Sequence, residues 1–380
     1  MRAKQFIFDG TTGWKDDHGS PSLGDPQLVL LFGSREQFAK PEFHQGMRAR
    51  FPEARILSVS AGDVIIGNRV LEGAGFATAV EFASTRVEAV AEYVGSAKDS
   101  ESTGEALAKR LPHEGLRHVL LFSEGLNING TGLIRGLTGV LPPSVSVTGG
   151  LASDGARFEK TLVGLDSPPS PNCIVAAGFY GESIRVGMGS LGGWESFGPE
   201  MEITLSEGNV LYELGGKPAL GVYKKLLGAR AYGLPASGLL FPLNIQPAGG
   251  GDSMVRTLLA VDEKKGSVSF AGDVPEGFTA RVMEANLDRL IDAAGSAAAM
   301  ASSLTAEKPD LALLISCIGR KLLLQLRTVE EVRSARRIFG DRAVFAGFYS
   351  YGEISPLLAE AACQLHNQTM TITTFSEQPA

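Results

Sequence analysis

An arginine and a glutamate near the C-terminus, each following an apolar run, are the residues best placed to bind a charged ligand. Arg320 comes after "LALLIS" and Gly319, and Glu353 comes after "AVFAGFYSYG". Ligands bind where strands end at a sheet edge, and a guanidinium can hold a carboxylate through two parallel hydrogen bonds. We expect Arg320 and Glu353 to bind the carboxylate and the ammonium of an amino-acid-like ligand. The alternative is that the two side chains only pair with each other.

Aromatic and polar residues close to this pair complete the predicted site. Tyr349 and Tyr351 belong to the same stretch, "GFYSYGEISP", and would wall the pocket, while Asn367 lies in the polar stretch "LHNQTMTIT". Gly352, directly before the acid, has no side chain and lets a ligand approach the backbone. We therefore include Tyr349, Tyr351 and Asn367 among the ligand-binding candidates.

The acid at the end of this turn has two earlier counterparts. "SVSAGD" ends in Asp63 and "SVTGGLASD" ends in Asp154, and both join the ligand-binding candidates. Each of the three turns closes a similar unit, which opens with "LVLLF", "HVLLF" or "LALLIS" and continues through a segment with helical spacing. A shift of 290 residues places Asp63 on Glu353, and we interpret the match as an internal duplication.

The order of these segments predicts an α/β protein. Short apolar runs alternating with helical segments are typical of strands in a partly parallel sheet covered by helices. The middle of the chain, such as "MEITLSEGNVLYEL", instead has the turn signals of antiparallel pairs. We predict two related domains with mixed parallel and antiparallel sheets flanked by helices, over residues 25–215 and 216–376, with a boundary near Gly215.

Composition limits the classes of function. The chain has 380 residues, 44% of them hydrophobic, a net charge of −7 and a pI near 5.4, which argues against a nucleic-acid or anionic-membrane surface. Three widely separated cysteines fit free thiols in a reducing compartment. The N-terminus lacks the apolar core of a signal peptide, and no run reaches the length of a membrane span. We expect a cytoplasmic protein without membrane insertion; the sequence carries no signal for its oligomeric state.

The motifs that would indicate an enzyme are incomplete. "GMGSLG" at residues 187–192 has dinucleotide-binding spacing, but Pro199 follows too soon for the required helix. Ser350 is not spaced as in a GxSxG elbow, and Cys363 and His366, three residues apart, are typical of packing. No two histidines have the i, i+4 spacing of a zinc site. We predict that the chain is not an enzyme; the alternative is an unrecognised acyl hydrolase.

Several stretches resemble a known family. "SCIGRKLLL", "TVEEV", "GFYSYGEISP" and "LHNQTMTIT" are similar to the C-terminal half of the FIST sensory domain. "SVTGGLASD", "GFYGESIRVGMGSLGGWESFG" and "SEGNVLYELGGKPALGVYKKLLG" are similar to its N-terminal half, so the resemblance runs from about Leu28 to the end. The family often has a Cys-Ser/Thr-x-Gly-Glu turn where this chain has Val59 to Asp63, so a role that depends on that cysteine does not carry over.

The resemblance implies a bacterial intracellular sensor of small ligands, with amino acids proposed, that signals through a separate partner protein. Some stand-alone members are similar to haem-binding nitric-oxide sensors that act on a histidine kinase or a cyclic-di-nucleotide enzyme. For that second reading His366 is the preferred axial ligand, because it precedes a strand within a polar stretch. Its alternative role is that of a structural histidine. The small-ligand sensor is the leading hypothesis, with no cofactor required.

Overall fold

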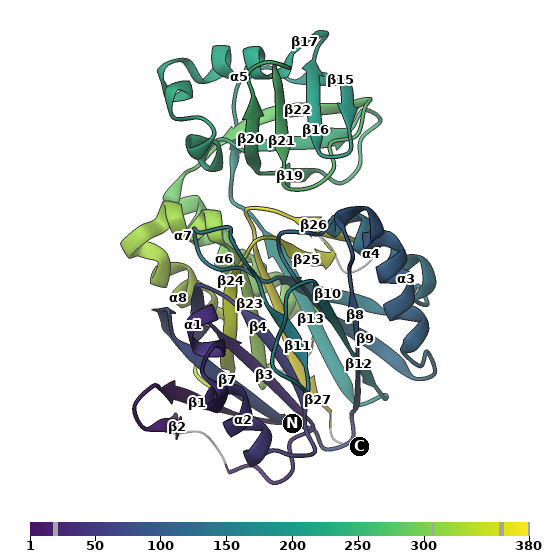
Figure 1. The fold of residues 1–380 in the computed structure, drawn as a ribbon, viewed down its shortest axis with the longest axis vertical. Coiled ribbons are helices and arrows are strands. Elements are labelled where there is room, and N and C mark those ends of the chain that lie inside the picture. The colour runs from purple at the N-terminus through teal and green to yellow at the C-terminus, as the bar shows by residue number, and fades with distance from the viewer. Residues whose placement is uncertain (18–21, 306–307, 357–360, 379–380) are drawn as a thin grey trace.

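The computed structural model describes residues 1–17, 22–305, 308–356 and 361–378 and confirms the α/β class with mixed sheets. It has two lobes (Figure 1). The larger lobe, here called the body, contains residues 1–191 and 287–378; the smaller, called the cap, contains residues 195–284. Two short connections, 192–194 and 285–286, join them.

Three six-stranded sheets build the body. The first has the order β11 (Val163–Leu165), β4 (Arg55–Ser60), β3 (Leu28–Gly33), β7 (Gly75–Glu81), β1 (Arg2–Asp9), β2 (Gly13–Asp16). The second has the order β26 (Cys363–His366), β25 (Glu353–Pro356), β10 (Ser146–Leu151), β9 (Leu116–Ser123), β12 (Cys173–Tyr180), β8 (Arg86–Tyr93). The third has the order β13 (Ile184–Leu191), β27 (Met370–Glu377), β23 (Leu311–Cys317), β24 (Val344–Ser350), β5 (Asp63–Ile66), β6 (Arg69–Glu72).

The three sheets repeat one pattern. Each is centred on a parallel pair, β3 with β4, β9 with β10, or β23 with β24, and the first strand of each pair has an antiparallel neighbour on its other side. These pairs are the three units predicted from the apolar runs. Every residue of β3 and β23 is buried, as expected for continuous apolar strands in the middle of a sheet.

The units also exchange short strands in a cycle. The strand after the first unit, β5, pairs with β24 of the third; β25 of the third pairs with β10 of the second; and β11 of the second pairs with β4 of the first. Asp63 opens β5 and Glu353 opens β25, so the two acids occupy matching positions. The predicted duplication is thus confirmed, and the repeat has three copies.

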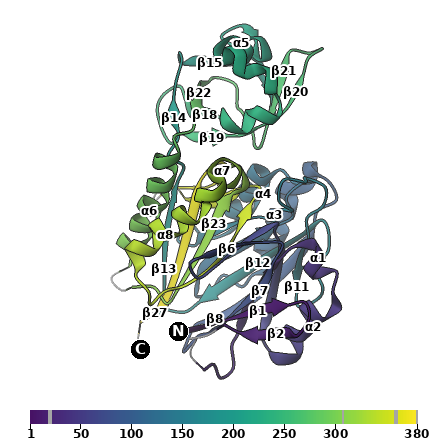
Figure 2. The ribbon, with the colours of Figure 1, turned by 90° about the vertical axis from the view of Figure 1, so that its left-hand side faces the viewer.

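Helices cover the outer faces of these sheets. Figure 2 shows α6 and α8 side by side over the third sheet, and α3 packs on α4 over the second. The α3–α4 contact depends on glycine, since a Cβ on Gly136 would lie 1.9 Å from the carbonyl oxygen of Glu101. The body helices are α1 (Arg35–Phe38), α2 (Pro41–Arg50), η1 (Ala97–Asp99), α3 (Ser100–Arg110), α4 (Gly130–Val140), α6 (Leu287–Ser303), α7 (Ile318–Leu324), η4 (Gln325–Arg327) and α8 (Thr328–Phe339).

The core of the body requires all three units. The rings of Phe32, Phe122 and Phe348, one from each unit, lie together with centroids 5.2 to 5.9 Å apart. The N-terminal and C-terminal parts of the chain therefore share one core. The structural lobes divide the chain differently from the predicted ranges 25–215 and 216–376.

The cap has its own sheet and its own core. Gly215 and Gly216, which suggested a boundary, have positive φ values and form the turn between β16 and β17 inside the cap. The helix α5 ends at Gly228, a C-cap residue with positive φ. The cap elements are β14 (Glu195–Ser196), β15 (Met201–Glu207), β16 (Val210–Leu214), β17 (Lys217–Pro218), α5 (Ala219–Leu227), η2 (Gly228–Gly233), η3 (Ala236–Leu240), β18 (Leu243–Pro247), β19 (Met254–Arg256), β20 (Leu258–Asp262), β21 (Ser267–Phe270) and β22 (Phe278–Glu284).

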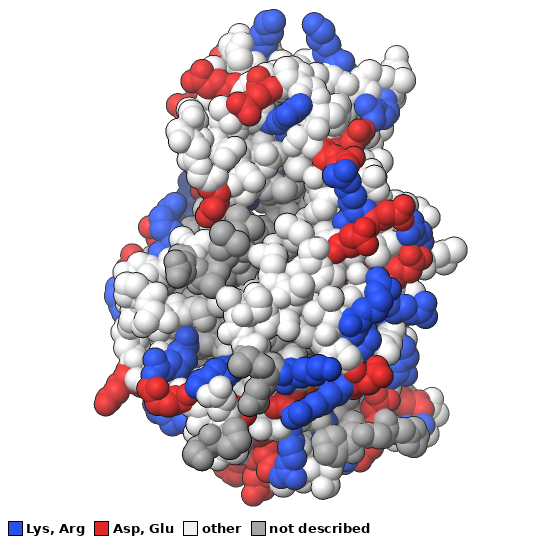
Figure 3. All heavy atoms as spheres, turned by 180° about the vertical axis from the view of Figure 1, so that it is seen from behind, with Lys and Arg blue, Asp and Glu red and all other residues white. Residues whose placement is uncertain are grey.

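Two surface properties bear on function. On the face seen from behind, basic and acidic side chains interleave over both lobes (Figure 3). Within the described ranges, no helix combines the length and the apolar character needed to cross a membrane.

Candidate functional site

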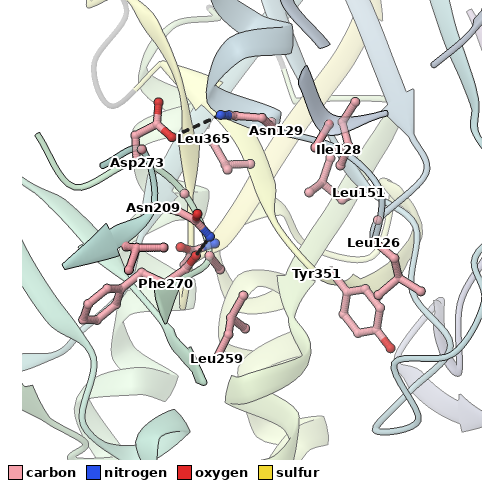
Figure 4. Close-up of a pocket in the computed structure, with 18 of the residues that line it drawn as sticks. Leu126, Ile128, Asn129, Leu151, Asn209, Leu259, Phe270, Asp273, Tyr351 and Leu365 are labelled. Atoms are coloured by element: carbon pink, nitrogen blue, oxygen red, sulfur yellow. Dashed lines mark hydrogen bonds between the residues drawn. The ribbon is translucent and has the colours of Figure 1, made fainter. Parts of the chain in front are cut away.

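A cavity of about 540 Å³ lies between the cap and the body (Figure 4). This volume is in the range of small-molecule pockets. Figure 4 shows cap residues on one side and body residues on the other. We call this cavity the interlobe cleft; its lining includes Lys98, Gly125, Leu126, Ile128, Asn129, Leu151, Phe158, Tyr351, Leu365 and Asn367 from the body, and Glu207, Asn209, Val210, Leu259, Phe270, Gly272 and Asp273 from the cap.

The body side of the cleft is formed by the loop between β9 and α4, residues 124–129. Asn129 ends this loop and caps α4, since its side-chain oxygen accepts the Gly132 amide at 2.9 Å. Gly125 packs so closely against the segments that follow β10 and β24 that a Cβ there would lie 2.0 Å from the Ala152 carbonyl oxygen and 2.9 Å from the Tyr351 ring. Glycine is therefore required at the base of the cleft.

Three hydrogen bonds cross from the body to the cap beside the cleft. Asn129 Nδ2 donates to Asp273 Oδ1 at 3.1 Å (Figure 4), and the Thr257 amide donates to Asn367 Oδ1 at 3.4 Å. Arg256 Nη1 donates to the Leu365 carbonyl at 3.1 Å. Outside the cleft lining, Gln368 Nε2 donates to the Leu239 carbonyl at 3.2 Å and Arg289 Nε lies 2.6 Å from Glu195 Oε1, so a few polar contacts in all join the cap to the body.

Arg256 is a buried cation in this set of contacts. Only 2% of the residue is exposed, and its Nε donates to the Asp273 carbonyl at 2.8 Å. Among the residues described, no carboxylate lies within ion-pair distance of it. Burial lowers the pKa of Arg256 to about 10, so the guanidinium stays charged at neutral pH.

The walls of the cleft are largely apolar. Leu126 on the body and Leu259 on the cap are 40% and 47% exposed, so each offers free apolar surface to a ligand. Tyr351 stacks on Phe158 with ring centroids 4.4 Å apart. The Tyr351 hydroxyl donates to Asp154, so the ring that was predicted to wall a pocket is held in place.

The sequence-predicted residues are divided between two cavities. Tyr351 and Asn367 line the interlobe cleft, whereas Asp63 and Asp154 line a second cavity of about 470 Å³ in the body. In that cavity Lys321 Nζ lies 2.5 Å from Asp63 Oδ1, and burial raises the pKa of Asp63 despite this pair. Arg35 lies 3.3 Å from Asp154. Burial opposes ionisation of Asp154, but the Tyr351 hydroxyl and backbone amides hold its pKa below the usual value.

Arg320 and Tyr349 contact neither cavity. The Arg320 guanidinium is wholly buried and binds Glu331 on α8, with Nε and Nη2 at 3.1 and 2.9 Å from Oε2. Tyr349 donates to the other oxygen of Glu331 at 2.6 Å. Arg320 also donates to the Leu290 carbonyl at 2.7 Å. This corrects the expected position of Arg320: it neither faces a ligand pocket nor pairs with Glu353.

Glu353 is also wholly buried and lines neither cavity. Its carboxyl accepts hydrogen bonds from the Ser350 hydroxyl and from the amide and hydroxyl of Thr369, the last two at 3.2 and 3.0 Å. Burial raises the pKa of Glu353 to about 8, and Arg320 opposes this only from a distance. Glu353 is thus closed off from both cavities, and a ligand in either cavity would not reach its carboxyl, contrary to the predicted direct contact.

His366 does not fit an axial haem ligand as it lies here. Its ring is buried, its Nε2 is 2.8 Å from the Ser355 carbonyl oxygen, and it lines neither cavity. Burial lowers its pKa to about 4. An axial ligand needs a free ring nitrogen beside a space for the porphyrin. Nor do three His, Cys, Asp or Glu side chains meet as a metal site anywhere in the described part of the chain.

In two of the three acid turns the acid forms an ion pair with a cation, and among the described residues the third acid has none. We number them with their units: residues 61–63, 152–154 and 351–353. At the first, Asp63 is paired with Lys321 from the segment after β23; at the second, Asp154 is paired with Arg35 from the segment after β3. By the same cycle, residues 124–129 after β9 should supply the cation that pairs with Glu353, but they contain no Lys or Arg. The interlobe cleft lies at this third turn, where Gly125 meets Tyr351.

Comparison with known families places a boundary inside the cap, between residues 217 and 219. A family model described as the FIST N domain matches residues 27–217, and one described as the FIST C domain matches residues 219–356. The chain belongs to the FIST family. FIST domains are sensory domains of signal transduction and are not catalytic, which is consistent with the expectation of a non-enzyme. No curated protein matches the chain.

Both FIST segments line the cleft. Leu126 and Asn209 come from the FIST N segment, and Leu259 and Tyr351 come from the FIST C segment. The cap residues and the 124–129 loop of this FIST protein were not among the residues predicted from the sequence. A usable signal was present, because "SEGLNIN" places glycine and asparagine directly after a buried strand, where binding loops often occur.

Proposed function

We propose that this FIST protein is a sensor that binds a small organic ligand in the interlobe cleft and signals through a separate partner protein. The observation that carries the proposal is the cleft itself, a cavity of about 540 Å³ lined by both FIST segments and by exposed apolar side chains. A ligand that fills it contacts both lobes at once. Because amino acids are the ligands proposed for the FIST family, amino acids and related amines are the first compounds to test.

The lobes offer a route from ligand to signal. Only residues 192–194 and 285–286 connect them, and the contacts beside the cleft are a small number of hydrogen bonds. A ligand shifts a conformational equilibrium only if it binds one arrangement better than the other. A molecule held between Leu126 and Leu259 favours the arrangement in which the cap is close to the body, and a partner protein can recognise that arrangement.

Filling the cleft tests the proposal. Thermal melts of the wild type are recorded with a panel of the natural amino acids and their decarboxylated amines, and the hits are repeated with Leu126→Trp. Leu126 is 40% exposed, so the larger ring can enter the cleft without disturbing a packed core. Leu205→Trp is the matched control, because Leu205 is 44% exposed on the cap and does not line the cleft.

We expect the hits to stabilise the wild type and Leu205→Trp and to lose their effect on Leu126→Trp. Stabilisation by a ligand grows with its concentration relative to Kd, so the comparison is made at several concentrations. Equal stabilisation of Leu126→Trp and Leu205→Trp would place the binding site outside the cleft.

A further inference from the structure

The charges around the interlobe cleft indicate what kind of ligand it takes. Three side chains that are charged at neutral pH line it: Lys98, Glu207 and Asp273. Lys98 and Glu207 are exposed, which places them at the rim, whereas Asp273 is half-buried and held by Asn129. Among the described residues, Asp273 has no ion pair. Asp273, which Arg135 and Arg256 approach only from beyond ion-pair distance, is therefore the charged side chain inside the cleft, and its charge is negative.

The body wall behind the cleft also lacks a cation. Glu353 is buried without an ion pair, although Asp63 and Asp154 at the other two turns are paired with Lys321 and Arg35. The segment that would supply the third cation instead begins with Glu124, a buried carboxyl whose Oε1 has no hydrogen-bond partner among the described residues. The third turn thus holds no cation that would repel a ligand ammonium, and burial keeps its acid, Glu353, neutral at neutral pH because the pKa is raised to about 8.

The nearby Arg256 does not reverse this balance for a ligand. Its Nε and Nη1 are occupied by the carbonyls of Asp273 and Leu365, and the residue does not line the cavity. A ligand carboxylate could reach only Lys98 at the exposed rim, where an ion pair contributes little. A ligand ammonium could reach Asp273, where a charge-assisted hydrogen bond is stronger because the group is partly shielded from water.

We infer that the cleft binds an amphipathic amine: a cationic nitrogen at Asp273 and an apolar group between Leu126 and Leu259. This inference rests on the proposed function, because it concerns the ligand of the same cleft. It differs from the amino-acid expectation in that no carboxylate is needed, and a carboxylate close to Asp273 is disfavoured by like charge.

Three probes of similar size and different charge test the inference by calorimetric titration: 2-phenylethylamine, 2-phenylethanol and 3-phenylpropionate. We expect the amine to bind the wild type about tenfold or more tightly than the alcohol, which is the effect of one hydrogen bond to a charged group. We expect the carboxylate to bind more weakly than the alcohol. Asp273→Asn should remove the preference for the amine and leave binding of the alcohol unchanged.

Glu207→Gln is the matched control, since it removes a negative charge at the exposed rim and should keep most of the preference for the amine. The inference is overturned if the alcohol or the carboxylate binds as well as the amine, or if the amine does not bind at millimolar concentration. The inference is equally overturned if Asp273→Asn keeps the wild-type preference. None of these results decides whether the cleft binds ligands at all, which the comparison of Leu126→Trp with Leu205→Trp decides separately.

Discussion

Asn129 Nδ2 lies 3.1 Å from Asp273 Oδ1, and this hydrogen bond joins the body to the cap at the edge of the interlobe cleft (Figure 4). The same amide caps α4 through its oxygen. The Asn129 side chain therefore both orders the 124–129 loop and holds the cap on the body, so the order of this loop and the position of the cap are coupled.

Placing a second negative charge at this contact tests the coupling. Asn129→Asp keeps a good helix cap but replaces the donor with a carboxylate facing Asp273. We expect the cap to move away from the body, which small-angle scattering would detect as a larger radius of gyration. The double variant Asn129→Asp with Asp273→Asn restores one donor and one acceptor and should restore the compact state. A single variant as compact as the wild type would show that the contact does not hold the cap.

Glu353 should make the protein less stable as the pH rises. Its pKa is about 8 in the folded protein, because of burial, against 4.5 when exposed. The contribution of the neutral Glu353 to the free energy of unfolding is therefore fully present below about pH 4.5. It is progressively lost as the pH rises from there through the folded pKa of about 8. Glu353→Gln cannot ionise, and its amide can still bond with Ser350 and Thr369.

We expect Glu353→Gln to gain stability relative to the wild type between about pH 5 and pH 9, by up to a few kcal/mol. Urea unfolding at a series of pH values measures this difference. Curves that stay parallel over the whole range would mean that Glu353 is ionised in the folded state.

The buried pair of Arg320 and Glu331 should contribute to stability and not to ligand binding. Arg320→Met leaves a carboxylate buried without its cation, which costs about 3–5 kcal/mol. Changing both residues to Met should cost less than the single change, because no charge then remains buried. Urea unfolding gives both values, and titration with the best-binding panel compound gives the affinity. A loss of affinity in folded Arg320→Met, with stability unchanged, would restore the predicted ligand-binding role of Arg320.

Gly125 should not tolerate a side chain. Because a Cβ there would meet the Ala152 carbonyl oxygen at 2.0 Å, Gly125→Ala should destabilise the protein by roughly 1–3 kcal/mol. The control is Gly139→Ala in α4, where a Cβ meets nothing within 4 Å. That change should stabilise the helix by roughly 0.5–1 kcal/mol. Thermal melts that show the same sign for both variants would contradict the close approach at Gly125.

The strands and acid turns were predictable because their signals are local. Continuous apolar runs and glycine-containing turns marked β3, β9 and β23 and the positions of Asp63, Asp154 and Glu353. The exchange of β5, β11 and β25 between units joins segments far apart in the chain and leaves no periodic pattern. The same is true of the binding site, in which Asn129 meets Asp273 across 144 residues.

Other differences have equally specific causes. Arg320 follows a strand, as predicted, but its partner is a glutamate on the next long helix, and a spacing of eleven residues is not a recognised signal. Gly215 and Gly216 form a tight turn between β16 and β17 inside the cap, and the boundary between the two FIST segments, at residues 217–219, directly follows this turn. Burial of Glu353 depends on neighbours from other strands and cannot be read from its own turn.

The most direct test of the central claim is a crystal structure of the protein with the panel compound that stabilises it most. We predict ligand density in the interlobe cleft, between Leu126 and Leu259 and in contact with both lobes. Density in the second cavity beside Asp63 and Lys321, or on the outer surface with the cleft empty, would contradict it.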